Sequence, residues 1–593
     1  MLKIKEIFRK INGIRNYKAV RVVATVAFPV LLVLVTEVTQ MQSQHALFDF
    51  VTKRTTIFFF NLFFVGLIYA GLLYIVKRAW IAAIPLTIVC YIFALIEFFK
   101  HRSSGIHFDI ADLVMARDIG QLTKFGGVAI NKWIVGTSLV LILYVLILFW
   151  LKAKVTMKKR LCSILTGLSC VVAAVSIIAT PVGGPVFSLM RINTEIASNP
   201  IASEIKFNDN SFLAGLVESV NAKATKKVEE YSLPEDIERT VDFVLLDGTE
   251  PTSDIQPNII VIMCESYADF RTLFKDVDDK YYTNFDIFRD DGNPFTAIVP
   301  AFGGSTVRTE FEMLFGLPMY SIPTVTLPQF EFVPRERQFS VAAQIKSRGY
   351  YSTYVHPYRK NFYSRETIYS QFGFDKMLYE EELSDREYRG MHVSDQATFE
   401  VVMEEIDKTD APLYLHASTM QNHQPYGFYG GPSEYDFYMG HIEATDKALG
   451  YLKEQLEALE EPTIVVFTGD HLPNFVEEDA ESIKRSGRTF YNPFSDLGLT
   501  QATAHKIYRQ EAFAWSNYGA DLSAFSGDIS TFYLPYMMID AAGVGLSPLG
   551  NTVLNEKKTM PVYNSNYKTT IPRNDTLDLL THDIVYGDCF SDK

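Results

Sequence analysis

The chain has 593 residues, of which 48% are hydrophobic, and a formal net charge of −14. This length exceeds one ordinary domain, so we expect two or more regions. The acidic balance argues against nucleic acid as a partner, because no basic stripe is present to neutralise phosphates. Only Cys264 and Cys589 lie beyond the hydrophobic N-terminal part, so a disulfide framework is not expected.

Five apolar runs precede residue 180, and each is close to the ~20 residues that a helix needs to cross a bilayer. They cover residues 22–38, 56–76, 80–99, 133–151 and 161–179. The first run is flanked by Arg21 and Glu37 and could also serve as an uncleaved signal anchor. A buried soluble helical bundle is the alternative, but the repeated length favours five membrane spans, which we assign to a transmembrane domain over 1–180.

Lysine and arginine gather in three segments that flank these runs. One precedes the first run, one separates the second from the third, and "KAKVTMKKR" (152–160) separates the fourth from the fifth. With five spans these segments share one side of the membrane, and basic loops face the cytoplasm. Lys53, Arg54 and a few basic residues in 100–132 are exceptions. We expect a multi-pass cell-membrane protein with a cytoplasmic N-terminus and an extracellular region after Ala179.

Two less hydrophobic stretches join these parts. The apolar residues of "FDIADLVMARDIGQLTKF" (108–125) recur at roughly helical spacing, which predicts an amphipathic helix on the outer membrane surface or a solvated loop helix. Residues 181–250 are mixed and polar without a strong period, and we assign them to a linker. Ala222 and Ala224 in this linker form an A-x-A pattern, but it lies far from any hydrophobic run, which disfavours release by a signal peptidase.

From about residue 255, short apolar strands alternate with amphipathic helices. The expected strands cover 258–263, 351–356, 413–418 and 463–470. This alternation predicts an α/β domain over 251–593, with a mainly parallel sheet sandwiched by helices. Ligands of such sheets bind beyond the carboxyl ends of the strands.

Polar residues follow two of these strands where they end. The first strand leads into Glu265, and the strand over 463–470 leads into Asp470 and His471. Each residue type alone is more often a surface or capping residue. Together, Glu, Asp and His are ligands suited to Mn²⁺, Mg²⁺ or Zn²⁺. The sequence therefore predicts a divalent-metal site at this edge.

The stretch "VPAFGGSTVRTEFEMLFG" (299–316) places a Gly-Gly pair and two hydroxyls before a predicted helix. One interpretation is an ordinary capping box formed by Thr309 and Glu312. The other is chemical, because the hydroxyl of Ser305 or Thr306 would sit where helix N–H groups converge and could attack phosphorus.

Five motifs in order resemble the lipoteichoic acid synthase family: "CES", "GGSTVRTEFE", "HPYRKNFYSR", "NHQPY" and "FTGDHLP". Members of this family are polyglycerol-phosphate transferases of Gram-positive bacteria within the alkaline phosphatase/sulfatase superfamily. The resemblance extends over the whole chain. It implies a five-helix transmembrane bundle, a linker and an extracellular sulfatase-like catalytic domain.

The resemblance also implies roles for individual residues. Thr306 resembles the family's catalytic nucleophile, with Ser305 as an additional small residue between the glycines and Thr306. The metal ligands implied are Glu265, Thr306, Asp470 and His471. They would hold one divalent cation, with Mn²⁺ expected first and Mg²⁺ or Zn²⁺ as alternatives.

A second group of residues corresponds to the family's substrate-binding set. His356, Tyr363 and Arg365 resemble the headgroup-binding residues, and His423 resembles the catalytic histidine beside the phosphate. His423 could protonate the departing lipid oxygen or hydrogen-bond the phosphate. Two positions depart from the family pattern: Tyr363 stands where several relatives have Trp, and Arg308 where Asn or Asp is common. Both could change headgroup or acceptor preference.

The implied activity is transfer of glycerol phosphate from phosphatidylglycerol to a glycolipid or another cell-envelope glycan, through a covalent threonine intermediate. A phosphoethanolamine transferase and a catalytically silent envelope-binding homologue are the alternatives. A sulfatase is disfavoured, because no Cys/Ser-x-Pro-x-Arg motif lies near the turn. The insertion at 476–510 has no assigned role, and neither have His392, His416, His441 and His505.

Overall fold

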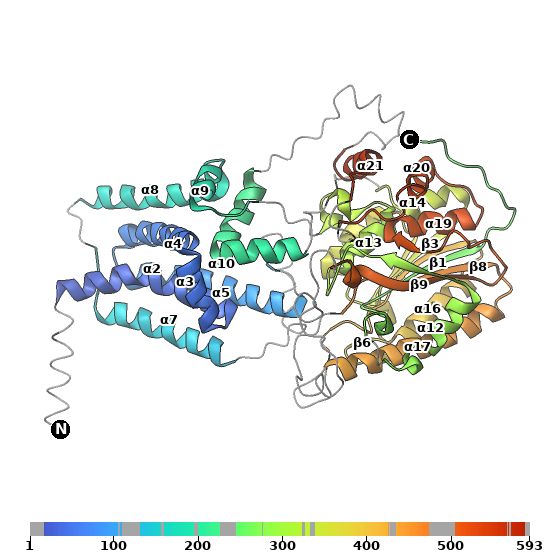
Figure 1. The fold of residues 1–593 in the computed structure, drawn as a ribbon, viewed down its shortest axis with the longest axis horizontal. Helices are drawn as coiled ribbons and strands as arrows, with labels where there is room; N and C mark the ends of the chain where they lie inside the picture. The colour runs from blue at the N-terminus through green and yellow to red at the C-terminus, as the bar shows by residue number, and fades with distance from the viewer. Residues whose placement is uncertain are drawn as a thin grey trace. The chain divides into compact units, whose positions relative to one another are not determined.

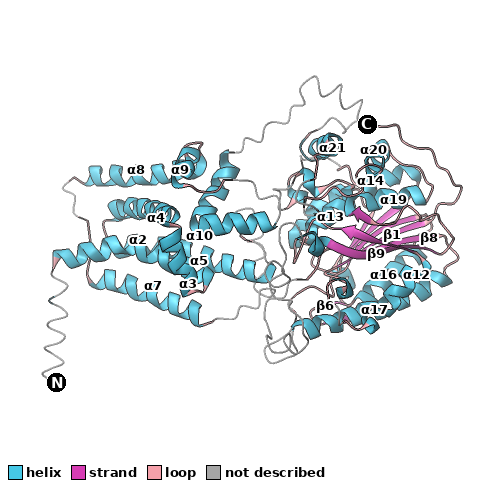
Figure 2. Ribbon diagram, viewed as in Figure 1, coloured by secondary structure: helices cyan, strands magenta, loops and turns pink. Residues whose placement is uncertain are grey.

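The structure is a computed structural model, and it divides into two compact units, Met1–Glu229 and Glu230–Lys593 (Figures 1 and 2). It describes residues 13, 17–104, 107–108, 131–155, 159–194, 200–225, 245–274, 277–322, 327–332, 338–424, 426, 434–473, 504–565, 567 and 571–587. Apart from Phe108, the predicted amphipathic helix over 108–125 lies outside these residues. Residues 476–503 of the insertion at 476–510 also lie outside the described residues.

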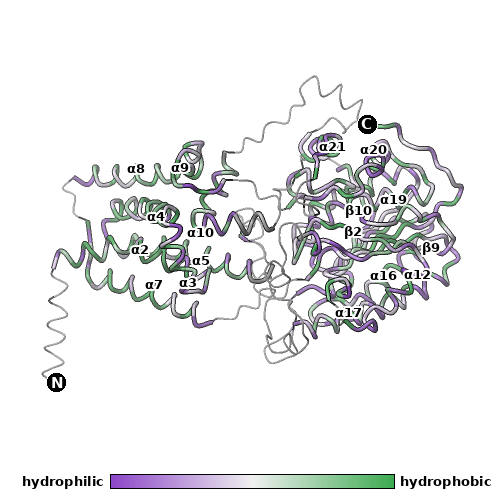
Figure 3. Tube along the Cα trace, in the orientation of Figure 1, coloured by the Kyte–Doolittle hydropathy of each residue, from purple (hydrophilic) through white to green (hydrophobic). Residues whose placement is uncertain are grey.

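Five helices among the described residues of the first unit are long and apolar enough to cross a membrane. They are α2 (Lys18–Met41), α4 (Thr55–Val76), α5 (Ala79–Ser104), α7 (Lys132–Trp150) and α8 (Arg160–Ala179). The five apolar helices predicted from the sequence are therefore confirmed. These helices are largely hydrophobic along their length (Figure 3), and apolar side chains such as Leu139, Leu143 and Leu168 are about half exposed, as expected where lipid replaces water.

Small residues let two of these helices approach closely. A Cβ on Gly71 of α4 would lie 3.0 Å from the Gly167 carbonyl oxygen of α8, and a Cβ on Gly167 would lie 2.6 Å from the Gly71 oxygen. Such contacts between small residues are a usual means of packing membrane helices. The two glycines let the backbones of α4 and α8 approach each other, with the side chains of Val171 and Ile75 packed beside them.

The described residues of the first unit also form α3 (Gln44–Lys53), α9 (Gly183–Met190) and α10 (Pro200–Thr225). The last two fall within the predicted linker, whose residues 195–199 and 226–244 lie outside the described part of the chain. α10 is interrupted at Ser211, where φ is 60° and ψ 178°. Asn221 of α10 donates hydrogen bonds to the carbonyl oxygens of Ile177 and Thr180, at 2.9 Å each, so α10 is joined to the end of α8.

The second unit is built on an eight-stranded sheet with the order β10-β2-β9-β8-β1-β7-β3-β4. The strands are β1 (Asn258–Cys264), β2 (Asn293–Ile298), β3 (Tyr351–Val355), β4 (Lys376–Leu378), β7 (Leu413–Ser418), β8 (Thr463–Gly469), β9 (Arg509–Ser516) and β10 (Asp528–Ser530). Only β9 pairs antiparallel with its neighbours β2 and β8. The predicted mainly parallel sheet is confirmed. A separate hairpin joins β5 (Tyr388–Arg389) to β6 (His392–Val393).

Helices cover both faces of this sheet (Figure 1). Side chains of β1 alternate between two cores: Ile259, Val261 and Met263 belong to one, and Ile260 and Ile262 to the other. On the first face lie α13 (Thr306–Phe315), α14 (Val341–Ile345), α19 (Leu534–Ala541), α20 (Pro548–Lys557) and α21 (Asp575–Tyr586). On the second lie α12 (Thr283–Asp291), α16 (Asp395–Asp407) and α17 (Glu434–Ala458). The short α15 covers Arg365–Ile368.

Candidate active site

Strand register brings the predicted metal ligands to one point at the edge of the sheet. β1 and β8 run parallel, and Cys264, the last residue of β1, is paired with Gly469, the last of β8. Glu265 and Asp470 follow these partners directly, so both carboxylates leave the sheet at the same level. His471 comes one residue later.

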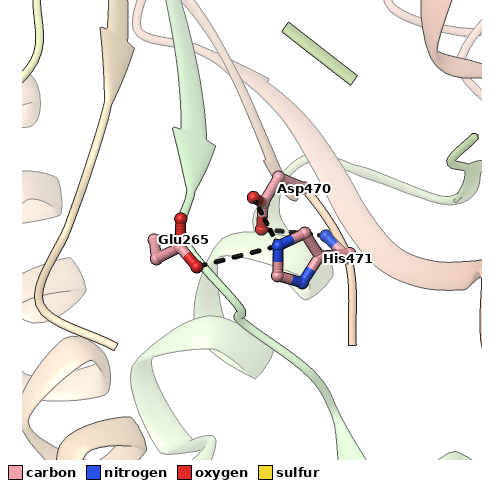
Figure 4. Close-up of side chains that lie close together, drawn as sticks. All are labelled: Glu265, Asp470 and His471. Carbon is pink, nitrogen blue, oxygen red and sulfur yellow. Dashed lines mark hydrogen bonds and ion pairs between the residues drawn. The ribbon is translucent and has the colours of Figure 1, made fainter. Parts of the chain in front are cut away.

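These three side chains are buried and close together (Figure 4). One ligand atom from each lies within 4.8 Å of the others. The His471 Nε2 atom is 3.1 Å from Asp470 Oδ2 and 3.7 Å from Glu265 Oε1. Neighbouring groups hold the carboxylates in place: the backbone N–H of Ser266 donates to Asp470 Oδ1 at 2.7 Å, and the Ser266 hydroxyl donates to Glu265 Oε1 at 2.7 Å.

Of the two candidate nucleophiles Ser305 and Thr306, Thr306 contacts this cluster through its hydroxyl. It is the first residue of α13, and its Oγ1 donates to Glu265 Oε2 at 3.1 Å and lies 3.4 Å from His471 Nε2. Ser305 precedes it as the N-cap in a left-handed conformation, with φ at 65°, and makes no side-chain cap. The preceding Gly303 and Gly304 also have positive φ values, of 66° and 148°, which glycine adopts without strain.

The capping-box interpretation of this turn is wrong. The Thr309 hydroxyl donates to the Asp470 carbonyl oxygen at 2.7 Å, and Glu312 accepts a hydrogen bond from the Met319 backbone at 2.9 Å. Both side chains are buried, and neither caps the start of α13: the partner of Thr309 is 161 residues away, and that of Glu312 lies seven residues further along the chain. Thr309 therefore joins α13 to the segment that carries two of the candidate ligands.

The cluster is suited to a cation. His471 Nδ1 lies 3.0 Å from the Leu472 carbonyl oxygen, so Nδ1 carries the proton and Nε2 presents a lone pair toward the carboxylates. Burial raises the pKa of Asp470 well above its ordinary value, and Glu265 raises it further. Burial lowers the pKa of His471, although Glu265 opposes this. Within the described residues, Asp470 Oδ2 has no hydrogen-bond donor. Buried acceptors that converge in this way are stabilised by a divalent metal ion.

The predicted headgroup residues His356 and Arg365 are both buried, with exposed fractions of 2% and 1%. His356 Nδ1 lies 3.0 Å from the Ser418 carbonyl oxygen, and burial followed by the Arg365 charge lowers the His356 pKa to about 3. The Arg365 guanidinium packs over the Tyr363 ring at 5.2 Å. Arg365 Nε and Nη1 and His356 Nε2 have no hydrogen-bond partner among the described residues. The two unsatisfied guanidinium N–H groups suit a phosphate, whereas His356 Nε2 presents a lone pair because Nδ1 carries the ring proton.

Glu310 belongs to this group, although sequence reasoning missed it. Its carboxylate is fully buried, lies 3.0 Å from Arg365 Nη2 and accepts hydrogen bonds from Ser418, Tyr354 and Tyr369. Burial alone would raise the Glu310 pKa, but Arg365 and the other donors outweigh it and lower the pKa to about 2. The signal was in the sequence, because a residue four positions after Thr306 lies on the same face of α13.

His423 lies in the loop that follows β7. Its Nδ1 lies 2.6 Å from the Gln424 carbonyl oxygen, and its ring centroid is 5.6 Å from that of His392 in β6. His392 is itself buried and packs edge-on against Tyr358, with centroids 5.7 Å apart. His392 thus lies beside a predicted site residue although the sequence assigned it no role.

Comparisons with known proteins show what the second unit is similar to. Residues 257–544 match the sequence model of the Sulfatase family. The second unit is a sulfatase-like domain. The chain is 27% identical over 307 residues to a putative cyclic β-1,2-glucan modification protein of Rhizobium meliloti, covering 49% of this chain and 46% of the relative. It is 25% identical over 266 residues to a lipoteichoic acid synthase of Staphylococcus saprophyticus, covering 40% of each.

Two solved structures are similar to part of this chain. One is the Streptococcus pyogenes phosphoglycerol transferase GacH in complex with sn-glycerol-1-phosphate, with 19% identity and a TM-score of 0.44 over 60% of this chain and 91% of that one. The other is the lipoteichoic acid synthase LtaP of Listeria monocytogenes, with 17% identity and a TM-score of 0.41 over 54% and 81%. The chain spans half or less of the length of the curated relatives named above.

Proposed function

We propose that the chain is a membrane-anchored phosphotransferase. It transfers glycerol phosphate from phosphatidylglycerol to a glycolipid or another cell-envelope glycan through an ester on Thr306. In this proposal the N-terminus is cytoplasmic and the sulfatase-like domain is extracellular. The observation that carries the proposal is the Thr306 hydroxyl at the start of α13, 3.1 Å from Glu265 and 3.4 Å from His471.

The first half-reaction uses groups of this chain in distinct ways. The Thr306 Oγ1 proton is directed at Glu265, which leaves an oxygen lone pair for phosphorus. A bond forms from Oγ1 to phosphorus as the bond from phosphorus to the diacylglycerol oxygen breaks. His423 protonates that departing oxygen or hydrogen-bonds the phosphate. The free N–H groups of Arg365 hold the phosphate oxygens, and Glu310 keeps Arg365 in position.

A divalent cation fits the ligands Glu265, Asp470, His471 and Thr306. When bound, such an ion lowers the pKa of a coordinated hydroxyl and neutralises charge on transferring phosphoryl oxygens. In the second half-reaction a hydroxyl of the acceptor attacks phosphorus as the bond from phosphorus to Thr306 Oγ1 breaks, and the proton lost by the acceptor restores the Thr306 hydroxyl. The similarity to a relative named as a glucan modification protein supports a glycan as one acceptor.

The test incubates the full chain in detergent with labelled phosphatidylglycerol or phosphatidylethanolamine, with and without a chelator. We expect metal-dependent diacylglycerol release from phosphatidylglycerol and a glycerol phosphate ester on the peptide that contains Thr306. Thr306→Ala should lose both signals, whereas Ser305→Ala should keep them. Undiminished release by Thr306→Ala would refute the proposal, and turnover of phosphatidylethanolamine alone would reassign the donor.

A further inference from the structure

A cavity of about 540 Å³ lies within the first unit, between α9, the segment that follows it and the second half of α10. Its polar lining includes Ser188, Arg191, Glu218 and Asn221, and its apolar lining includes Phe187 and Ile192. The volume is within the range of small-ligand sites, which combine an apolar wall with a few polar groups. This cavity is separate from the candidate active site, because all its lining residues belong to the first unit.

The cavity lies at the end of a membrane-length helix. Asn221, one of its lining residues, binds the carbonyl oxygens at the end of α8, so the cavity is held at that level. Gly183 makes this approach possible, since a Cβ there would lie 2.5 Å from the Ile177 oxygen and 2.6 Å from the Asn221 amide nitrogen. The end of an apolar helix of this length coincides with the headgroup region of a bilayer.

Exposed apolar side chains flank the cavity. Leu189 of α9 is 79% exposed and Val182, just before α9, is 55% exposed, whereas Phe187 between them is buried. An apolar side chain that is exposed beside a membrane span is stabilised by contact with acyl chains. A lipid could therefore place its chains over Val182 and Leu189 and its headgroup in the cavity.

The charges of the lining favour an anion. Glu218 is buried and lies 2.7 Å from Lys206, so these two charges offset each other. Arg191 is exposed at the C-terminus of α9, and within the described residues its side chain forms no ion pair. A guanidinium binds a phosphate with two parallel hydrogen bonds. The hydroxyls of Ser188 and Thr194, both in the lining, can hydrogen-bond the ester oxygens or hydroxyls of a headgroup.

We propose that this cavity binds the headgroup of an anionic glycerophospholipid of the surrounding membrane, with its phosphate on Arg191. The site would hold one lipid against the membrane unit. This inference does not rest on the proposed transfer reaction, and it stands or fails separately from it.

The test uses the full chain in lipid nanodiscs and a photoreactive phosphatidylglycerol, with the labelled peptides identified by mass spectrometry. Gly184→Leu should fill the cavity, because a Cβ at Gly184 meets no atom within 4 Å. Arg191→Gln removes the cation. The matched controls are Gly136→Leu, at another open glycine on α7, and Lys159→Gln, at the opposite end of α8.

In the wild type we expect label on the peptides that contain α9 and the end of α10. Arg191→Gln should reduce this label about tenfold, because loss of a hydrogen bond to a charged group weakens binding by about that factor. Gly184→Leu should reduce it similarly, and both controls should label as the wild type does. Equal labelling of Arg191→Gln and wild type would overturn the proposal, and this exposed variant decides the question if Gly184→Leu does not fold. Equal labelling by a phosphatidylcholine probe would overturn the anionic preference. Loss of label in excess soluble glycerol 1-phosphate would overturn the lipid as the ligand.

Discussion

Replacing Glu310 by glutamine tests how the domain holds a buried arginine. The Glu310–Arg365 pair has almost no exposure to solvent, so Glu310→Gln leaves the Arg365 charge buried without its counter-ion. Removal of one partner from such a pair costs about 3–5 kcal/mol of the free energy of unfolding. The pKa gives a similar figure: a shift from the ordinary 4.5 to about 2 corresponds to about 3 kcal/mol at neutral pH.

The assay is thermal unfolding of the full chain in detergent, followed by a probe of the sulfatase-like domain. A loss of about 3 kcal/mol should lower the Tm of a domain of this size by about 5 °C. Glu404→Gln is the matched control, because Glu404 is 35% exposed and pairs with Arg386 and Lys408 at the surface. A surface pair of this kind contributes less than about 1 kcal/mol.

The pH dependence has a defined sign. Since the folded-state pKa of Glu310 is lowered, its contribution is complete above about pH 4.5 and is lost as the pH falls toward 2. The difference in Tm between wild type and Glu310→Gln should therefore be constant from pH 7 to 5 and shrink below 4.5. Adding Arg365→Met should restore much of the lost stability. The reasoning is refuted if Glu310→Gln unfolds within 1 °C of wild type, or if Arg365→Met lowers the Tm further.

Three more predictions concern other parts of the second unit. Mn²⁺ at 100–1,000 times its Kd should raise the free energy of unfolding of the wild type by about 3–4 kcal/mol, and a chelator should reverse this gain. Asp470→Asn should show neither effect. A Tm of Asp470→Asn that still rises with Mn²⁺ would contradict Asp470 as a proposed ligand. Burial lowers the pKa of His416 from 6.5 to about 4, so the unfolded chain binds a proton that the folded one does not. Protonation of His416 in the unfolded chain should then lower the free energy of unfolding by roughly 3 kcal/mol between pH 6.5 and 4. His416→Gln should flatten the dependence of the Tm on pH over this range. An unchanged dependence in His416→Gln would exclude His416 as its cause. Gly316 has φ at +63°, and a Cβ there would lie 2.1 Å from the Tyr536 ring, so Gly316→Ala should cost at least about 3 kcal/mol by denaturant unfolding. Gly349→Ala, with φ at +87° but open space, should cost only about 1 kcal/mol, and equal losses would disprove the steric argument.

The sequence by itself determined the elements whose signal is local. Apolar runs of membrane length predicted the five long helices, and short apolar runs before Glu265 and Asp470 predicted β1 and β8. These signals are local because a helix or a buried strand needs a continuous set of apolar side chains. The sequence also predicted that Glu265 and Asp470 lie at the same edge of the sheet, because each follows a strand and parallel strands end at the same edge.

Only the tertiary structure decided which groups meet. The sequence left both Ser305 and Thr306 as candidates, and the αL conformation of Ser305 turns Thr306 toward Glu265. It also could not predict that Glu310 would pair with Arg365, 55 residues away, or that Thr309 would bind the Asp470 carbonyl oxygen. Such partners depend on register between distant strands and on how a helix is rotated over the sheet. A buried charge is therefore satisfied by whatever group the completed fold brings to it, and no local pattern encodes that choice.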